Sequence, residues 1–137
     1  AKVVIQTYQP DNDVIKAVSA RKTEAFLKSQ LHERSSFYYP PYSRLIEVYV
    51  LHKVKKKLEI AAIELRKLST FEAKVRLLGP EFEEVQRLRS FYRMRMILKF
   101  PSKDHSYVKS RLHEVMDQFS RTPSASGIRF NINVDPY

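Results

Sequence analysis

The run from Leu88 to Phe100 alternates between two kinds of side chain, and no other feature of the sequence constrains the fold as strongly. One set comprises Leu88, Tyr92, Met94, Met96, Leu98 and Phe100, and the other includes Arg89, Phe91, Arg93, Arg95 and Lys99. Because successive side chains of a strand point to opposite faces, the pattern predicts a long strand with a buried face and a basic outward face. Such strands are typical of antiparallel sheets that are covered on one side.

Five further segments place this strand in an α+β fold. Helices are expected over residues 53–70 and 102–120, where apolar side chains recur at helical spacing, and strands over residues 44–51, 73–78 and 128–135. Gly79-Pro80 is expected to end the second of these strands. The order β-α-β-β-α-β predicts a four-stranded antiparallel sheet with both helices on one face, and with its first and third strands in the centre.

The first 43 residues differ in character from the rest. A β-branched run at 3–7 predicts a short strand, and helical patterns follow Pro10 and cover residues 21–34. The segment Tyr39-Pro-Pro-Tyr42 predicts an extended connector, because a double proline fits neither a helix nor a central strand. One strand and two helices cannot enclose a core of their own. We therefore predict one domain over residues 44–137 and, in residues 1–43, the tail of an upstream domain cut from a larger protein.

The formal charge of +10 arises mainly from residues 44–137, which carry nineteen Lys and Arg against eleven Asp and Glu. A surplus of this size favours an anionic partner such as nucleic acid or an acidic peptide. On the outward sheet face, cations alternate with aromatic rings, as in proteins that track phosphates with charge and stack bases on rings. The predicted nucleic-acid-binding residues are Tyr49, Arg87, Arg89, Phe91, Arg93, Arg95 and Lys99, and Lys74, Arg76 and Arg129 are expected on the same face.

The basic pattern has a second interpretation. A half-exposed sheet commonly carries charged residues on its solvated face, where they also prevent edge-to-edge aggregation. Another basic run, Lys53-Val-Lys-Lys-Lys57, lies at a predicted helix start, which is the unfavourable end of the helix dipole for cations. For both basic groups, two interpretations remain open: a solvated surface and a binding surface.

The sequence offers little support for catalysis. It contains no cysteine and only two glycines, which excludes thiolate metal sites, a Walker A loop and a GxGxxG loop within this chain. The four histidines are dispersed and form no i, i+4 pair, so neither a metal site nor catalytic residues are predicted. Glu81, Glu83 and Glu84 are expected in a solvated acidic loop. No apolar run has the length of a membrane-spanning helix.

Six short strings extend over essentially the whole chain. They are Val4–Pro10, Glu33-Arg34 together with Tyr39–Leu45, Leu78-Gly79-Pro80, Arg87–Arg93, Pro101-Ser102 and Asn133–Pro136. In order and spacing they resemble the C-terminal region of the primosomal protein N′ (PriA) family, the bacterial replication-restart DNA helicases. This chain has Ser90, Lys103 and Asn133 where the family usually has Gly, Arg and Asp.

The resemblance implies that residues 1–43 complete the second helicase lobe, and that residues 44–137 form a ferredoxin-like domain similar to ribosomal protein S10. That domain would help to bind branched or single-stranded DNA at stalled forks. It would also dock the acidic C-terminal tail of single-stranded DNA-binding protein, through Lys103 and Tyr107.

The resemblance also implies what the fragment lacks. The ATP, magnesium and zinc of the helicase would be held by upstream residues, so the fragment itself is expected to bind no cofactor and to catalyse no reaction. Other primosome proteins would be further partners, in the bacterial cytoplasm at the nucleoid and without a membrane partner. Two alternatives remain open: an RNA- or ribosome-associated module of S10-like fold, and a structural domain whose basic face packs against other parts of a larger protein.

Overall fold

The computed structural model describes residues 3–88 and 90–136, and for residues 84–88 it describes the backbone alone. The chain forms two compact units, Ala1–Phe37 and Tyr38–Tyr137. The second unit contains the sheet and the residues predicted to bind partners.

The second unit has the predicted β-α-β-β-α-β order. Its elements are β1 (Arg44–His52), α3 (Lys55–Leu68), β2 (Arg76–Leu88), β3 (Phe91–Phe100), α4 (His105–Ser120) and β4 (Arg129–Val134), with short 3₁₀ helices at Ser102–Asp104 and Pro123–Ala125. The strands form one antiparallel sheet in the order β2-β3-β1-β4, so β1 and β3 are central, as predicted. The α+β fold class is therefore confirmed.

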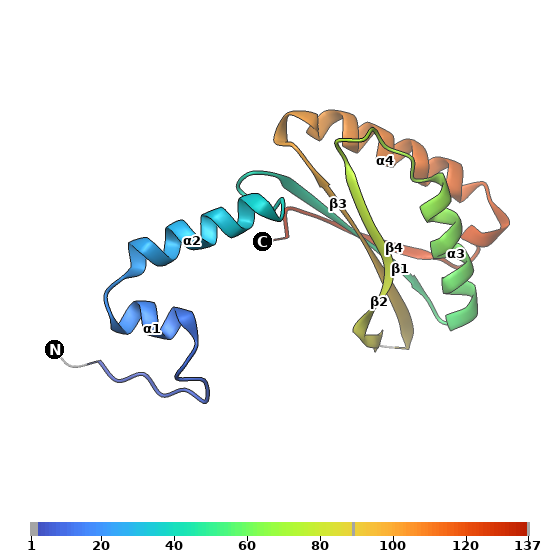
Figure 1. Ribbon diagram of the computed structural model, residues 1–137. Helices are drawn as coiled ribbons and strands as arrows, with labels where there is room; N and C mark the ends of the chain where they lie inside the picture. Colours follow the sequence, from blue (N-terminus) through green and yellow to red (C-terminus); the bar gives the residue numbers. More distant parts are fainter. Residues whose placement is uncertain (1–2, 89, 137) are drawn as a thin grey trace. The chain divides into compact units, whose positions relative to one another are not determined.

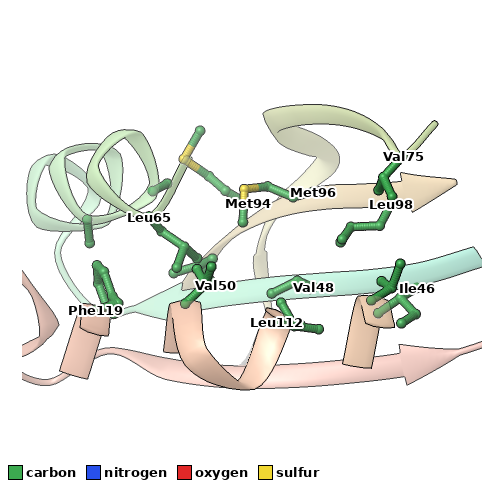
Figure 2. Packing of buried hydrophobic residues seen from close by; sticks show 14 of the residues in the cluster. Ile46, Val48, Val50, Leu65, Val75, Met94, Met96, Leu98, Leu112 and Phe119 are labelled. Carbon is green, nitrogen blue, oxygen red and sulfur yellow. The ribbon is translucent and has the colours of Figure 1, made fainter. Parts of the chain in front are cut away.

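Both helices cover the same face of the sheet (Figure 1). Ile46, Val48 and Val50 of β1 lie in one buried cluster with side chains from both helices. The helix side chains in this cluster are Leu58, Ala61, Ala62 and Leu65 of α3, and Val108, Leu112, Val115 and Phe119 of α4. Met94, Met96 and Leu98 of β3 complete it from the neighbouring strand (Figure 2). Of the predicted inward set, Met94, Met96, Leu98 and Phe100 are buried and Tyr92 is partly buried, while the side chain of Leu88 lies outside the described part of the structure.

The prediction that Gly79-Pro80 ends the second strand is wrong. β2 continues through this pair to Leu88, with a shift of register between Leu78 and Glu81. The reason is its position at the sheet edge, where a proline without an N–H group is tolerated at a bulge. Gly79 has a φ of +85°, and a Cβ there would lie 2.5 Å from the carbonyl oxygen of Arg95, so the bulge requires glycine. The expected acidic loop is consequently part of the strand.

The first unit contains α1 (Asp13–Ser19) and α2 (Thr23–Ser36), close to the predicted helices. Neither helix buries a residue, which agrees with the expectation that this region lacks a core of its own. The strand predicted at residues 3–7 does not form. Val3 is 84% exposed, and within the described part of this unit no other strand is present to pair with the segment.

The compact second unit begins at Tyr38, six residues before the boundary expected from the sequence. The ring of Tyr38 lies 3.7 Å from the guanidinium carbon of Arg76, and the ring of Tyr39 lies 3.7 Å from the ammonium of Lys99. Ser43 also donates a hydrogen bond from Oγ to the carbonyl oxygen of Tyr38 at 2.6 Å. These contacts attach the proline-rich connector to the sheet.

The end of β4 is attached to the start of β1 by Asp135. Arg44 donates from Nε to Oδ2 of Asp135 at 2.8 Å, and the N–H of Leu45 donates to Oδ1 at 3.2 Å. The Arg44 hydrogen bond lowers the pKa of Asp135 below its ordinary 3.8, while partial burial opposes this effect and the Leu45 N–H supports it. The charged carboxylate therefore favours the folded state.

We predict that Asp135→Asn lowers the melting temperature at pH 7 by about 2–5 °C, because it removes a partly exposed ion pair. A lowered pKa stabilises the fold above the unfolded value of 3.8, and this contribution is lost as the pH falls through the folded value. Calorimetric melts from pH 7 to pH 2.5 should therefore converge for variant and wild type. Asp11→Asn, in the first unit, is the control, and a pH-independent difference for Asp135→Asn would contradict the prediction.

Candidate nucleic-acid interface

The face of the sheet opposite the helices, here called the open face, carries the predicted binding residues. Residues paired across neighbouring strands share a face, so the pairing defines its rows. The rows are Arg76–Lys99–Leu45, Leu78–Ile97–Glu47–Asn133, Glu81–Arg95–Tyr49–Asn131 and Arg93–Leu51–Arg129. Arg93 and Arg95 lie on the central strand β3, and Arg129 lies on the edge strand β4.

The two central arginines are paired with carboxylates. Arg93 forms an ion pair with Glu83. Arg95 lies 3.5 Å from Glu47 through Nη1 and 3.3 Å from Glu81 through Nη2. The sequence alone did not indicate this pairing, because Glu81 and Glu83 were assigned to a loop rather than to the strand beside β3. The centre of the open face is therefore less basic than the alternating pattern suggests.

Glu47 lies in the middle of this charge network and is only 4% exposed. Tyr49 donates from its hydroxyl to Oε2 of Glu47 at 3.0 Å. Burial, followed by this hydrogen bond, raises the pKa of Tyr49 above its ordinary value. The guanidinium of Arg93 lies 4.8 Å from the centre of the Tyr49 ring. Tyr49 lies on the open face, as expected, but it is largely buried between charged neighbours.

Lys99 also lies on the expected face, but it is only 8% exposed. Its ammonium lies against the ring of Tyr39 from the connector. A cation over an aromatic ring gains electrostatic attraction that is strengthened when the contact is desolvated. At this end of the sheet, the connector therefore occupies the face that was expected to be open.

The opposite end of the open face is more accessible. Phe91, at the start of β3, is half-buried, and Arg129 at the start of β4 is exposed, with its guanidinium 4.8 Å from the Phe91 ring centre. The ammonium of Lys53, which follows β1, lies 5.8 Å from the same ring centre. The sequence predicted Phe91 and placed Arg129 on this face. The convergence of Lys53 on the same ring depends on the tertiary fold.

Two predicted residues belong to the hairpin between β2 and β3. Arg89 lies outside the described residues. Arg87 lies in β2 opposite Tyr92, and its side chain is outside the described part of the structure.

The residues predicted to bind a partner tail lie at the start of α4. Lys103 is exposed in the 3₁₀ turn before the helix, and Tyr107 lies in the first helical turn. Lys74 was expected on the open face, but its ammonium lies 5.7 Å from the Tyr107 ring centre and 2.8 Å from Asp104. The hydrogen bond to Asp104 is the main cause that raises the pKa of Lys74. Lys103 and Tyr107 therefore have a second cation and a carboxylate as neighbours.

Neither a metal-binding cluster nor a membrane-spanning helix is present among the described residues. No group of three or more His, Cys, Asp and Glu side chains there could hold a metal ion. Across the same residues, no helix combines the length and apolar character needed to span a membrane.

The fold and the charged open face define a class of α+β domain in which a single sheet, covered by helices on one side, presents cations and aromatic rings on the other. The family model described as the primosomal protein N C-terminal domain matches residues 35–137. The chain belongs to this family, and the resemblance seen in the sequence is confirmed.

Curated relatives agree with this assignment. The replication restart protein PriA of Bacillus subtilis is 26% identical over 98% of the chain, and that of Thermotoga maritima is 31% identical over 98%. The protein of the same name from Synechocystis is 33% identical over 74% of the chain. The chain spans only 17%, 17% and 12% of these relatives, respectively. It therefore corresponds to a small part of each of these relatives.

Among solved structures, a hydantoinase/carbamoylase family amidase from Burkholderia ambifaria aligns with 67% of the chain and 27% of its own, with a TM-score of 0.41 and 14% identity. A similarity at this level carries no argument about function.

We predict that Arg95→Ala lowers the free energy of unfolding by about 1–3 kcal/mol, because it removes a cationic partner of the buried Glu47. Adding Glu47→Gln should recover part of this loss, because burying a neutral amide without the Arg95 partner costs less free energy than burying a carboxylate without it. Urea denaturation of the four members of a double-mutant cycle measures the coupling. Lys67→Ala, an exposed cation on α3, is the control, and strict additivity of the two changes would contradict the pairing.

Proposed function

We propose that residues 38–137 form a non-catalytic binding domain of a replication-restart helicase, and that its open face contacts single-stranded or branched DNA at stalled forks. Family membership supports the setting in replication restart. The charge of the domain supports a polyanionic partner. We assign ATP hydrolysis and unwinding, with the nucleotide, magnesium and zinc that they use, to parts of the longer protein outside this chain. The proposed location is the bacterial cytoplasm, at the nucleoid.

One observation carries the DNA proposal: cations and aromatic rings are in contact along the open face. Arg93 lies on the Tyr49 ring, and both Lys53 and Arg129 lie on the Phe91 ring. Proteins that bind single strands combine cations that follow the phosphates with rings that stack on bases. These contacts bring both components of such an interface together on one face of the sheet.

The open face divides into two functional parts under this proposal. Lys99 and Arg95 are held by Tyr39, Glu47 and Glu81, and they mainly stabilise the domain. Arg93 pairs with Glu83, but it is partly exposed and lies in the same row as Arg129, so we assign it with Phe91 and Arg129 to the part that contacts DNA. Some cations of the alternating strand therefore serve stability, and others serve binding.

We predict that Arg93→Ala weakens binding of residues 1–137 to forked and single-stranded DNA. The slope of log K against log salt should become less steep by about 0.7 for single-stranded DNA, as expected for one lost phosphate contact. Fluorescence anisotropy at several salt concentrations measures both quantities.

Lys109→Ala is the matched control for this experiment, because it removes an exposed cation from α4 on the covered side of the sheet. An equal loss of DNA affinity in both variants would mean that binding depends only on the net charge of the domain. Tighter binding to RNA than to DNA of the same sequence, at fixed salt, would instead favour an RNA-associated module.

We also propose that the surface around Lys103 and Tyr107 docks the acidic C-terminal tail of single-stranded DNA-binding protein, and that other primosome proteins are further partners. Lys103 is exposed four residues before Tyr107, and the ammonium of Lys74 lies over the Tyr107 ring while it pairs with Glu72 and Asp104. A tail that ends in acidic residues and a phenylalanine offers carboxylates for the cations and a ring for the apolar contact. Lys103 binds a carboxylate as a point charge, without the bidentate geometry of an arginine.

We predict that Lys103→Glu weakens binding of a peptide that ends in acidic residues and phenylalanine by about tenfold or more, because it replaces attraction with repulsion. Lys103→Arg should bind the peptide at least as well as wild type, because the guanidinium can form a bidentate pair. Isothermal titration calorimetry with residues 1–137 measures these affinities. Unchanged binding by Lys103→Glu would place the tail elsewhere.

A further inference from the structure

A pocket lies at the accessible end of the sheet, where β1 ends and where β3 and β4 begin. It has a volume of about 490 Å³ and is lined by His52, Lys53, Val54, Phe91, Gly127, Ile128 and Arg129. We call it the sheet-end pocket. Its volume falls within the range of pockets that bind small organic ligands, which is large enough for a single nucleotide.

The cations of this pocket differ from those at the centre of the open face. Arg93 and Arg95 have carboxylate partners, whereas Lys53 and Arg129 contact the ring of Phe91. Among the residues whose side chains are described, neither Lys53 nor Arg129 has a carboxylate partner. Contacts with a half-exposed ring are weak, so both cations remain available to an anion that enters the pocket.

The wall of the pocket adds a further polar group. His52 is 8% exposed, and its Nδ1 lies 2.9 Å from the backbone nitrogen of Val54 and 3.1 Å from the carbonyl oxygen of the same residue. Nε2 has no hydrogen-bond partner among the described residues. Gly127 has a φ of +73°, and a Cβ there would lie 3.0 Å from Nε2. The absence of a side chain at Gly127 therefore leaves space beside this ring nitrogen.

The start of α3 strengthens the positive potential at the same place. Val54 lines the pocket and is the residue that precedes α3. Within this described segment, the first turn of the helix has no acidic residue, and its amide groups have no side-chain cap. The helix dipole and the following lysines thus add to the attraction that Lys53 and Arg129 exert on an anion.

We propose that the sheet-end pocket is a phosphate-binding subsite, in which Lys53 and Arg129 hold a phosphate group and Phe91 contacts the attached nucleotide. The inference rests on the proposed function in one respect, since it takes the phosphate to be part of a DNA strand. On binding, the two cations move from the ring to the phosphate oxygens. Arg129 can engage two oxygens at once, and movement of the cations uncovers Phe91 for contact with a base or sugar.

The experiment compares residues 1–137 of wild type with Lys53→Ala/Arg129→Ala and with the control Lys67→Ala/Lys109→Ala, which removes two exposed cations from the helices. Binding of an oligothymidylate of about 15 nucleotides is followed by anisotropy over a range of salt. The pocket variant should bind at least about tenfold more weakly at 0.1 M salt, with a slope of log K against log salt that is shallower by about 1.4, or about 0.7 for each lost contact. The control should retain most of the affinity.

A second readout locates the ligand. Amide resonances of Gly127 and Ile128 in ¹⁵N-edited NMR spectra are followed during titration with inorganic phosphate, thymidine monophosphate and the oligonucleotide. Shifts with all three probes would identify a site for phosphate itself, and shifts with the oligonucleotide alone would identify a site for the backbone of a strand. Both results support the subsite, provided that the pocket variant abolishes them.

The outcomes separate the two proposals. If wild type binds the oligonucleotide and the pocket variant binds equally well with the same slope, the subsite is overturned and DNA binding stands. If wild type binds no oligonucleotide but phosphate shifts Gly127 and Ile128, the DNA-binding function is overturned and the subsite stands. Shifts produced by an acidic peptide, with none from the phosphate probes, would overturn the subsite in favour of a peptide site.

Discussion

Coverage of the sheet on one side is the constraint on which the rest of this domain depends. Both helices pack against the face that carries Ile46, Val48 and Val50, and the apolar side chains of the domain gather there. The other face receives the alternate side chains of the same strands, and these are rich in charge. Because β1 is central and lies between β3 and β4, even its outward residues Glu47 and Tyr49 are buried by their neighbours. The domain must therefore accommodate charged groups at low exposure on its uncovered face.

Charge compensation meets this requirement and divides the open face into regions with different roles. In the centre, the carboxylate of Glu47 is balanced by Arg95 and by the hydroxyl of Tyr49. At one end, Tyr39 covers Lys99. At the other end, Lys53 and Arg129 lie on Phe91 and have no carboxylate partner among the described side chains. The open face is therefore not uniformly basic. Its centre contains paired charges that stabilise the domain, and one end carries positive charge that remains available for binding.

This division fits the proposed binding of DNA. A domain that binds DNA through all of its cations would require each of them to be exposed, and buried cations without partners are costly. By reserving some cations for internal pairing, the domain retains a stable sheet while the cations at the accessible end can respond to a ligand. The sheet-end pocket also gives this end a concave shape in addition to its charge, because His52, Gly127 and the ring of Phe91 line it.

The layers of the domain follow from local periodicity, so the sequence by itself determined them. Apolar alternation over residues 88–100 and helical spacing over residues 53–70 and 102–120 are properties of neighbouring residues, and the observed elements follow them closely. The partners of the charges depend instead on which strands become neighbours. Glu81 forms its ion pair with Arg95 only because β2 continues through Gly79-Pro80. The proline is tolerated at this bulge because β2 is an edge strand. The contacts of Lys53 and Arg129 with the ring of Phe91 likewise join residues that are far apart in the chain. The tertiary structure alone decided these contacts, because side-chain contacts between strands depend on register rather than on local sequence.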